Sequence, residues 1–163
     1  MFYTLLWLLG LVFTLIKARP SVLVGSEFIV PDLITALILY VFLVFGHAGS
    51  FIFALGQGYF MDLFSGGMQG LFTFLYLSVF GCILLSSKFF NLYSARGQVT
   101  IIGLVMLLKS VLFSISLTAF SQRAVFPVSF PWISALVAII TGITTPVIFY
   151  LFDILKAIRF DKS

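Results

Sequence analysis

The sequence predicts an all-α protein, a polytopic integral membrane bundle of six transmembrane helices. Its 163 residues are 62% hydrophobic and only 9% charged, whereas about a quarter of the residues in a soluble domain are charged. Its mean hydropathy is +1.25. One membrane-spanning helix needs about 20 apolar residues, so the length leaves room for about six helices with short connections. We expect residues 1–163 to form a single integral membrane domain.

Apolar segments alternate with short polar or proline-containing stretches along the chain. The first segment is followed by Lys17, Arg19 and Pro20, residues that anchor and end a helix. No basic residue precedes this segment and no small-residue cleavage pattern follows it. We therefore expect a retained helix rather than a signal peptide. The expected helices cover residues 2–16, 31–45, 51–64, 68–85, 100–120 and 132–158.

The second and the sixth predicted helices carry prolines in different positions. Pro31 suits the first position of the second helix, and Asp32 places a negative charge at the positive end of the helix dipole. Pro146 lies inside the sixth helix, where it removes a backbone hydrogen bond and should kink the helix. Thr144 and Thr145 are placed to satisfy part of the freed backbone.

The positive residues indicate the orientation in the membrane. Six helices place both termini on one side, which would carry five cations against three on the other side. The positive-inside rule therefore predicts cytoplasmic termini. The cations are spread over helix ends and form no basic stripe, so we expect contacts with membrane lipid and no nucleic acid partner. The five are Lys88, Arg96, Lys156, Arg159 and Lys162, and the three are Lys17, Arg19 and Arg123.

Lys109 is the ionisable residue that most needs an explanation. It lies near the middle of the fifth predicted helix, where a charge costs about 2.5 to 3.5 kcal/mol on insertion scales. We expect it to face the interior of the bundle. The expected partner is Asp62, which lies in the short third helix rather than at a charged helix end, either in an ion pair or across one polar cavity. The alternative is that backbone carbonyls and serines of the same helix satisfy Lys109, while Asp62 reaches the interface.

Five glycines and one carboxylate gather in the stretch GQGYFMDLFSGGMQG, which joins the third and fourth predicted helices. Asp62 lies four residues after Gly58 and three before Ser65, so these three residues share one helix face. Small residues at such spacings let helices approach closely in lipid, and two adjacent glycines favour a break. We expect a tightly packed helical hairpin. The candidates for packing or partner contact are Gly56, Gly58, Asp62, Ser65, Gly66 and Gly70.

Reactive side chains are few. The chain has one cysteine, Cys82, and one histidine, His47. A disulfide within the chain is therefore excluded, and too few ligands remain for an ordinary zinc site. The sequence shows no nucleophile with a credible base, no carboxylate pair and no phosphate-binding loop. We expect no enzymatic activity, no cofactor and no bound metal.

The stretch from Val30 to Gly70 resembles the bacterial rod-shape-determining protein family MreD. A helix that begins with Pro-Asp is followed by a glycine-rich helix that ends in G-x-x-x-D-x-x-S-G-x-x-x-G, and then by another apolar helix. The overall length also matches, and the proline at position 146 is a weaker match. Lys109 is not part of the resemblance. The motif residues in this chain are Gly58, Asp62, Ser65, Gly66 and Gly70.

The resemblance implies a subunit of the cell-elongation machinery in the bacterial cytoplasmic (inner) membrane, which directs lateral peptidoglycan synthesis and rod shape and has no known enzymatic activity. MreC is the expected direct partner. MreB, the glycosyltransferase RodA and a class B penicillin-binding transpeptidase are expected in the same complex. The family is also similar in fold to the substrate-binding subunits of energy-coupling-factor transporters, which favours six helices and leaves open an internal cavity.

Two functions follow from these observations. As a scaffold, the protein would hold the transmembrane helix of a partner through close packing and hydrogen bonds between helices. As a small-solute-binding component of a transporter, it would need several polar groups that converge in a cavity. The sequence offers few such groups, which favours the scaffold.

Overall fold

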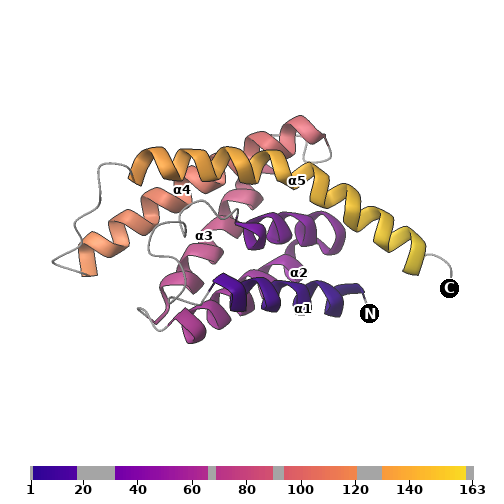
Figure 1. Ribbon diagram of the computed structural model, residues 1–163, viewed down its shortest axis with the longest axis horizontal. Helices are drawn as coiled ribbons and strands as arrows, with labels where there is room; N and C mark the ends of the chain where they lie inside the picture. The colour runs from indigo at the N-terminus through magenta and orange to yellow at the C-terminus, as the bar shows by residue number, and fades with distance from the viewer. Residues whose placement is uncertain (1, 18–31, 66–68, 90–93, 121–129, 161–163) are drawn as a thin grey trace.

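The computed structural model describes residues 2–17, 32–65, 69–89, 94–120 and 130–160 of the chain. These residues form five α-helices and no strand, which confirms the predicted all-α fold class. Figure 1 shows the helices in chain order, which are α1 (Phe2–Lys17), α2 (Leu33–Ser65), α3 (Leu71–Ser86), α4 (Ala95–Phe120) and α5 (Phe130–Phe160).

The predicted count of six helices is not confirmed, because the predicted second and third helices are joined in α2. Gly46 interrupts α2 with non-helical dihedral angles of φ 74° and ψ −166°, a conformation that is open to glycine and closed to other residues. The Ser50 hydroxyl donates to the carbonyl of Ile38 at 3.0 Å. In a straight helix these residues would lie about 18 Å apart. The chain therefore turns back at Gly46, and Figure 1 shows the two halves of α2 side by side.

The start of α4 differs most from the prediction, since α4 begins at Ala95 rather than at Thr100. The Ser94 hydroxyl accepts a hydrogen bond from the N–H of Gly97 at 3.1 Å, and the Ser94 carbonyl accepts one from the N–H of Gln98 at 3.0 Å. A serine in this position caps a helix N-terminus. The cap allows α4 to begin within a polar stretch, which has no apolar pattern from which a helix could be predicted.

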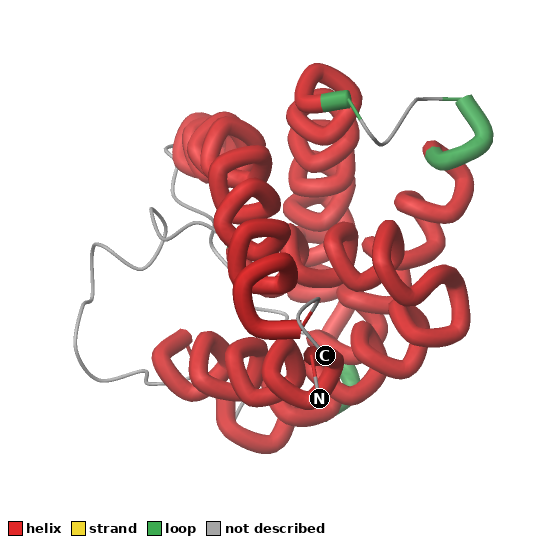
Figure 2. The backbone as a smooth tube through the Cα atoms, turned by 90° about the vertical axis from the view of Figure 1, so that its right-hand side faces the viewer, coloured by secondary structure: helices red, strands yellow, loops and turns green. Residues whose placement is uncertain are grey.

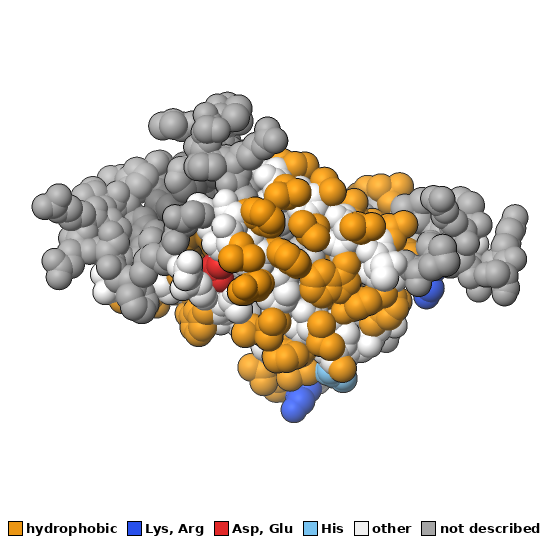
Figure 3. All heavy atoms as spheres, turned by 90° about the horizontal axis from the view of Figure 1, so that it is seen from below, with side chains coloured by type: hydrophobic (Ala, Val, Ile, Leu, Met, Phe, Trp, Pro, Cys, Tyr) orange, Lys and Arg blue, Asp and Glu red, His pale blue; other side chains and the backbone are white. Residues whose placement is uncertain are grey.

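Three helical stretches are long and apolar enough to cross a membrane, Leu33–Ser65, Arg96–Ser116 and Ala135–Ile154, and α1 and α3 are shorter apolar helices. Large apolar side chains such as Leu8 and Ile143 are more than 60% exposed. Figure 3 shows one such face, on which hydrophobic side chains cover most of the described surface and Lys or Arg side chains lie at the edge. An apolar surface of this kind is suited to contact with lipid, which supports the predicted location in a membrane. The bacterial inner membrane and the cytoplasmic termini stay predictions.

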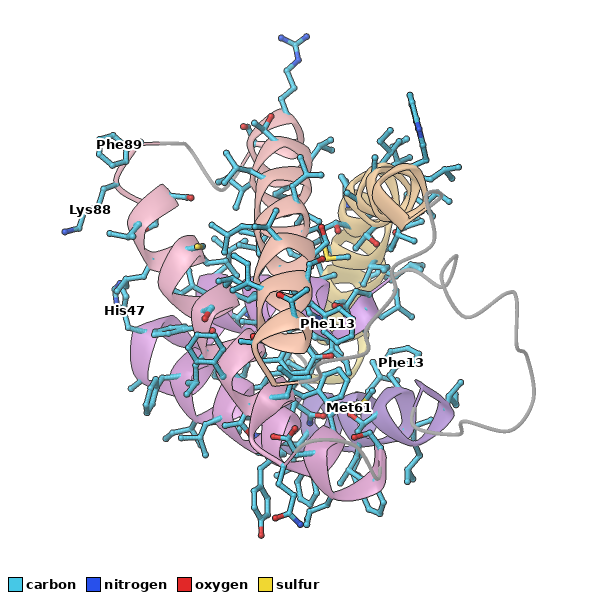
Figure 4. All side chains as sticks on the ribbon, turned by 90° about the vertical axis from the view of Figure 1, so that its left-hand side faces the viewer. Phe13, His47, Met61, Lys88, Phe89 and Phe113 are labelled. Atoms are coloured by element: carbon cyan, nitrogen blue, oxygen red, sulfur yellow. The ribbon has the colours of Figure 1, made fainter. Side chains whose placement is uncertain are left out.

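The helices form two neighbouring groups. α1 packs against α2, α2 against α3, and α4 lies beside α5 along the other side of the molecule (Figure 1). The start of α1 and the end of α5 lie at the same end of the bundle in Figures 1 and 2. Met61 is buried in the interior, whereas the side chains of His47 and Lys88 lie at the outer edge (Figure 4).

Pro146 lies inside α5 as predicted, and α5 bends in its second half in Figure 1. The two threonines before Pro146 bond carbonyls of the preceding turn of α5. Thr145 donates to the Thr141 carbonyl at 2.6 Å, and Thr144 donates to the Ile140 carbonyl at 2.9 Å and the Thr141 carbonyl at 3.1 Å. Each hydroxyl bonds carbonyls three or four residues back, at positions 140 and 141, as threonine does inside helices.

The bend directs the second half of α5 onto α2. The ring of Tyr40 lies 5.1 Å from the rings of Phe149 and Phe152 and 6.3 Å from that of Phe2. The Tyr40 hydroxyl donates to Asp153 at 2.9 Å. This aromatic cluster joins α1, α2 and α5 at the end of the bundle that carries the start of α1.

Candidate functional site

Two buried carboxylates organise the polar contacts inside this apolar bundle. Asp32 is 2% exposed and Asp62 is 6% exposed. A buried charge is costly unless it is paired and hydrogen-bonded. The contacts of each carboxylate therefore show which groups the interior of the bundle binds.

Asp32 forms an ion pair with Lys109, in which the Lys109 ammonium donates to Oδ2 of the carboxylate. The Lys109 side chain is 12% exposed. Its Nζ also lies 4.0 Å from the centroid of the Tyr76 ring, in a cation–π arrangement. The backbone N–H of Asp32 donates to the Thr141 hydroxyl at 3.1 Å, and the Thr35 hydroxyl donates to Oδ2 at 2.9 Å. The site thus unites the start of α2 with α3, α4 and α5.

The position of Asp32 at the start of α2 was predicted, but its depth was not. The Asp32 carbonyl accepts hydrogen bonds from the N–H groups of Thr35 and Ala36 at 3.1 and 3.4 Å, so Asp32 lies at the N-cap position of α2. Its negative charge lies at the positive end of the helix dipole, as we expected. Because Lys109 lies near the middle of α4, the start of α2 lies within the bundle rather than at its surface.

The predicted ion pair of Lys109 with Asp62 is wrong, whereas the second form of the prediction, in which both side chains face one polar cavity, stays a prediction. The Asp62 carboxylate already binds donors from α3, and Lys109 binds Asp32 instead. The alternative, in which serines of the same helix satisfy Lys109, also differs from the structure. Ser110 and Ser114 donate to carbonyls of their own helix. The prediction chose Asp62 because it lies in the short third helix rather than at a charged helix end, and the sequence contains no local sign that the start of α2 lies deep in the bundle.

Asp62 caps α3 from the neighbouring helix. Its Oδ1 accepts the N–H of Phe72 at 2.8 Å, and its Oδ2 accepts the N–H and the hydroxyl of Thr73 at 2.9 and 2.5 Å. The residue at the N-cap position is Gly70, which has φ 91° and no side chain that could cap the helix. Asp62 therefore supplies the acceptor that the local sequence lacks, at the helix end that favours negative charge.

Gly58 lets α2 and α3 approach closely at this cap. A Cβ atom on Gly58 would lie 2.5 Å from Cα and 3.0 Å from N of Thr73, too close for real atoms. Gly58 and Asp62 are one helical turn apart and both meet Thr73, so the predicted shared face of the hairpin is present in the structure. Gly56 serves a different contact, because a Cβ atom there would lie 2.1 Å from the ring of Trp7 in α1.

The other predicted candidates are distributed as follows. The Ser65 hydroxyl is buried at the end of α2, and no described residue is within hydrogen-bond geometry of it. Pro146 lies inside α5. Pro31 and Gly66 lie outside the described residues.

Gln57 is a polar contact residue that the sequence analysis did not single out. It is fully buried, its Oε1 accepts the Thr14 hydroxyl at 3.0 Å, and its Nε2 donates to the Trp7 carbonyl at 3.4 Å. The signal that was available is its position between Gly56 and Gly58, since a polar residue flanked by glycines in an apolar helix suits a close, hydrogen-bonded helix contact. Gln57 joins α2 to α1.

The polar side chains in the described interior mainly hold the helices together. Each buried carboxylate holds protein donors from other elements, and no group of three or more His, Cys, Asp or Glu side chains among the described residues is arranged to hold a metal ion. The chain matches no protein-family model, and searches among curated proteins and among solved structures find no similar protein.

Proposed function

We propose that the protein is a non-enzymatic membrane scaffold that binds the transmembrane helix of a partner. The observation that carries this proposal is the use of both buried carboxylates. Asp32 joins the start of α2 to α4 and α5, and Asp62 joins α2 to α3. Interior polar groups that are used in this way make the bundle rigid, which is what a scaffold requires, and they leave few groups to bind a solute.

The outer surface of α5 suits such a partner. Its exposed side chains recur every three or four residues, so they form one apolar stripe along the helix. Association of helices in lipid depends on close packing along stripes of this kind. The stripe consists of Leu136, Ile139, Ile143, Val147 and Leu151, each at least 50% exposed.

The resemblance to the MreD family supplies the biological setting of the proposal. The scaffold would lie in the bacterial cytoplasmic membrane with both termini in the cytoplasm. It would bind MreC directly and organise MreB, RodA and a class B penicillin-binding transpeptidase for lateral cell-wall synthesis. The two halves of α2 would count as separate crossings on either side of Gly46, giving six in total, as in the substrate-binding subunits of energy-coupling-factor transporters.

Cysteine crosslinking in the membrane tests this proposal. Cys82 is first replaced by serine, and single cysteines are then placed at the exposed positions Ile143 and Val147 of α5 and Tyr59 of α2. We expect crosslinks to co-expressed MreC, a single-span partner with a coiled coil. The matched control is a cysteine at the buried position Ile102, which should not react.

Co-purification provides the second measurement. A stable complex with MreC that survives detergent extraction supports the scaffold. Crosslinks confined to helices of this chain, together with no co-purified partner, would refute it.

The cluster around Asp32 favours the second candidate, a small-solute-binding membrane component. Charged and hydroxyl groups from four helices converge there at the start of a helix, an arrangement used in transporter binding sites. This candidate predicts a small ligand that stays with the purified protein and is lost in Lys109→Met. A protein that purifies without ligand but with MreC decides for the scaffold.

A further inference from the structure

The end of α3 and the start of α4 form an exposed basic corner of the bundle, which consists of Lys88, Phe89 and Arg96 and is called the α3–α4 corner below. Lys88 and Arg96 are both exposed, and neither forms an ion pair with a residue that the structure describes. Residues 86–100 contain these two cations and no carboxylate. The segment therefore does not neutralise its own positive charge.

Backbone hydrogen bonds fix the positions of the residues in this corner. The N–H groups of Lys88 and Phe89 each donate to a carbonyl three residues earlier, at 3.2 and 3.0 Å. Arg96 lies in the first turn of α4, which Ser94 caps. Figure 4 shows Lys88 and Phe89 directed away from the bundle. Both cations are thus attached to ordered helix ends and are available to a ligand outside the bundle.

Phe89 indicates that this ligand has an apolar part. Its side chain is 83% exposed, more than any other large apolar side chain that the structure describes. An aromatic ring beside a cation suits the boundary between lipid headgroups and acyl chains, where the ring contacts the apolar layer and the cation contacts phosphate. A small soluble anion would gain nothing from the ring.

The α3–α4 corner lies on the side of the molecule where both termini lie (Figure 1). Within α3, the Phe80 ring lies 6.4 and 5.7 Å from two phenylalanine rings that flank the Gly46 turn of α2. Near the end of α5, Lys156 adds an exposed cation, and Asp153 is the one carboxylate described at this end. The sequence predicts this side to be cytoplasmic, and the cytoplasmic leaflet has a negative surface potential.

We propose that the α3–α4 corner binds the headgroup of an anionic phospholipid. The Arg96 guanidinium and the Lys88 ammonium donate charge-assisted hydrogen bonds to the phosphate oxygens, and the Phe89 ring contacts the upper part of the acyl chains. A zwitterionic headgroup brings its own ammonium group, which the two cations repel, so the corner selects a lipid with net negative charge. This site is independent of the proposed scaffold function, because it needs no protein partner.

Lipid titration of the full-length protein in detergent tests the proposal. Short-chain phosphatidylglycerol and phosphatidylcholine of the same chain length are added separately, and bound lipid is measured by native mass spectrometry. We expect the native protein to bind phosphatidylglycerol more tightly. The double variant Lys88→Gln with Arg96→Gln should bind phosphatidylglycerol about 25-fold more weakly, which is about fivefold per cation, with phosphatidylcholine binding unchanged. Phe89→Ala should weaken the binding of both lipids.

Two control variants separate the corner from the overall charge of the protein. Lys156→Gln removes one cation outside the corner and should leave lipid binding unchanged, whereas Lys88→Gln should weaken it. Exchange of the two cations, Lys88→Arg with Arg96→Lys, keeps both charges and should keep the selectivity for phosphatidylglycerol. An equal loss in Lys156→Gln and Lys88→Gln, or a loss of selectivity in the exchanged variant, overturns the proposal.

The nature of the ligand is tested in the same assay. Equal affinity of the native protein for the two lipids overturns the proposal. Displacement of phosphatidylglycerol by an equal concentration of inorganic phosphate overturns it as well, since the corner would then bind a free anion. A glutamate-rich peptide that binds in place of the lipid, and is lost in the double variant, would assign the corner to an acidic protein instead.

Discussion

The two buried carboxylates of the bundle are held in opposite ways. Asp62 binds residues 10 and 11 positions further along the chain, in the next helix of a hairpin. Asp32 binds a lysine 77 positions away and a threonine 109 positions away. Asp62 accepts from backbone N–H groups and one hydroxyl, whereas Asp32 faces a full positive charge. One carboxylate completes a local motif, and the other joins the two groups of helices.

This difference has consequences for stability. A backbone N–H that loses its acceptor at a helix end has other ways to be satisfied, such as water or headgroups near a turn. A lysine in the middle of a helix within a bundle has few alternatives. We therefore expect the long-range pair to be less tolerant of change than the local cap.

Removal of the Asp32 charge has the largest expected effect. Asp32→Asn leaves the Lys109 ammonium without its carboxylate and should lower the free energy of unfolding by about 3 to 5 kcal/mol. Lys109→Met leaves the carboxylate alone and should have a similar effect. The double variant contains neither charge and should be much more stable than the sum of the single effects implies. Thermal unfolding in detergent measures the coupling.

A second cycle that combines Asp62→Asn with Lys109→Met is the control for the first. These residues do not bond each other, so their effects should add to within about 0.5 kcal/mol. Coupling in this cycle as large as in the first would contradict the assignment of Lys109 to Asp32.

Loss of the local cap should be the next largest effect. Asp62→Ala removes the acceptor for the Phe72 and Thr73 N–H groups and should cost about 2 to 3 kcal/mol. Asp62→Asn keeps one acceptor oxygen and should cost less. Hydrogen exchange of the first turn of α3 should rise more than exchange in α4. Equal increases in both helices would show that Asp62 supports more than this cap.

Close packing at the hairpin should contribute somewhat less. Gly58→Ala forces a Cβ atom against the backbone of Thr73 and should cost about 1 to 3 kcal/mol. Gly81→Ala is the matched control, because nothing lies within 4 Å of the added Cβ. There, the better helix propensity of alanine should leave stability equal or slightly higher. If both variants lose the same amount in thermal unfolding, close approach is not the reason for Gly58.

The smallest effect is expected for the Thr73 hydroxyl. Thr73→Val removes its 2.5 Å hydrogen bond to Asp62 but keeps both N–H donors and the shape of the side chain. It should lower the free energy of unfolding by about 1 kcal/mol. A loss as large as that of Asp62→Ala, measured in the same detergent, would mean that the hydroxyl rather than the backbone holds the carboxylate.

The sequence by itself determined the all-helical class, the apolar segments and the shared face of Gly58 and Asp62. It also placed Asp32 at the start of a helix and Pro146 inside another. These features depend on composition, on spacing along one helix or on the backbone chemistry of one residue, and all three are visible in a linear chain. The glycine-rich hairpin was predictable because its partners are close in sequence.

Only the tertiary structure decided that Lys109 pairs with Asp32 and that Asp62 caps α3. It also decided that a single non-helical residue, Gly46, separates the predicted second and third helices. In lipid, apolar helix faces differ little in their attraction for one another, so a hydrophobic pattern does not specify which helices meet. The depth at which α2 begins depends on that packing. Asp32 therefore lies beside Lys109 of α4, and Asp62 binds the start of α3 within the hairpin.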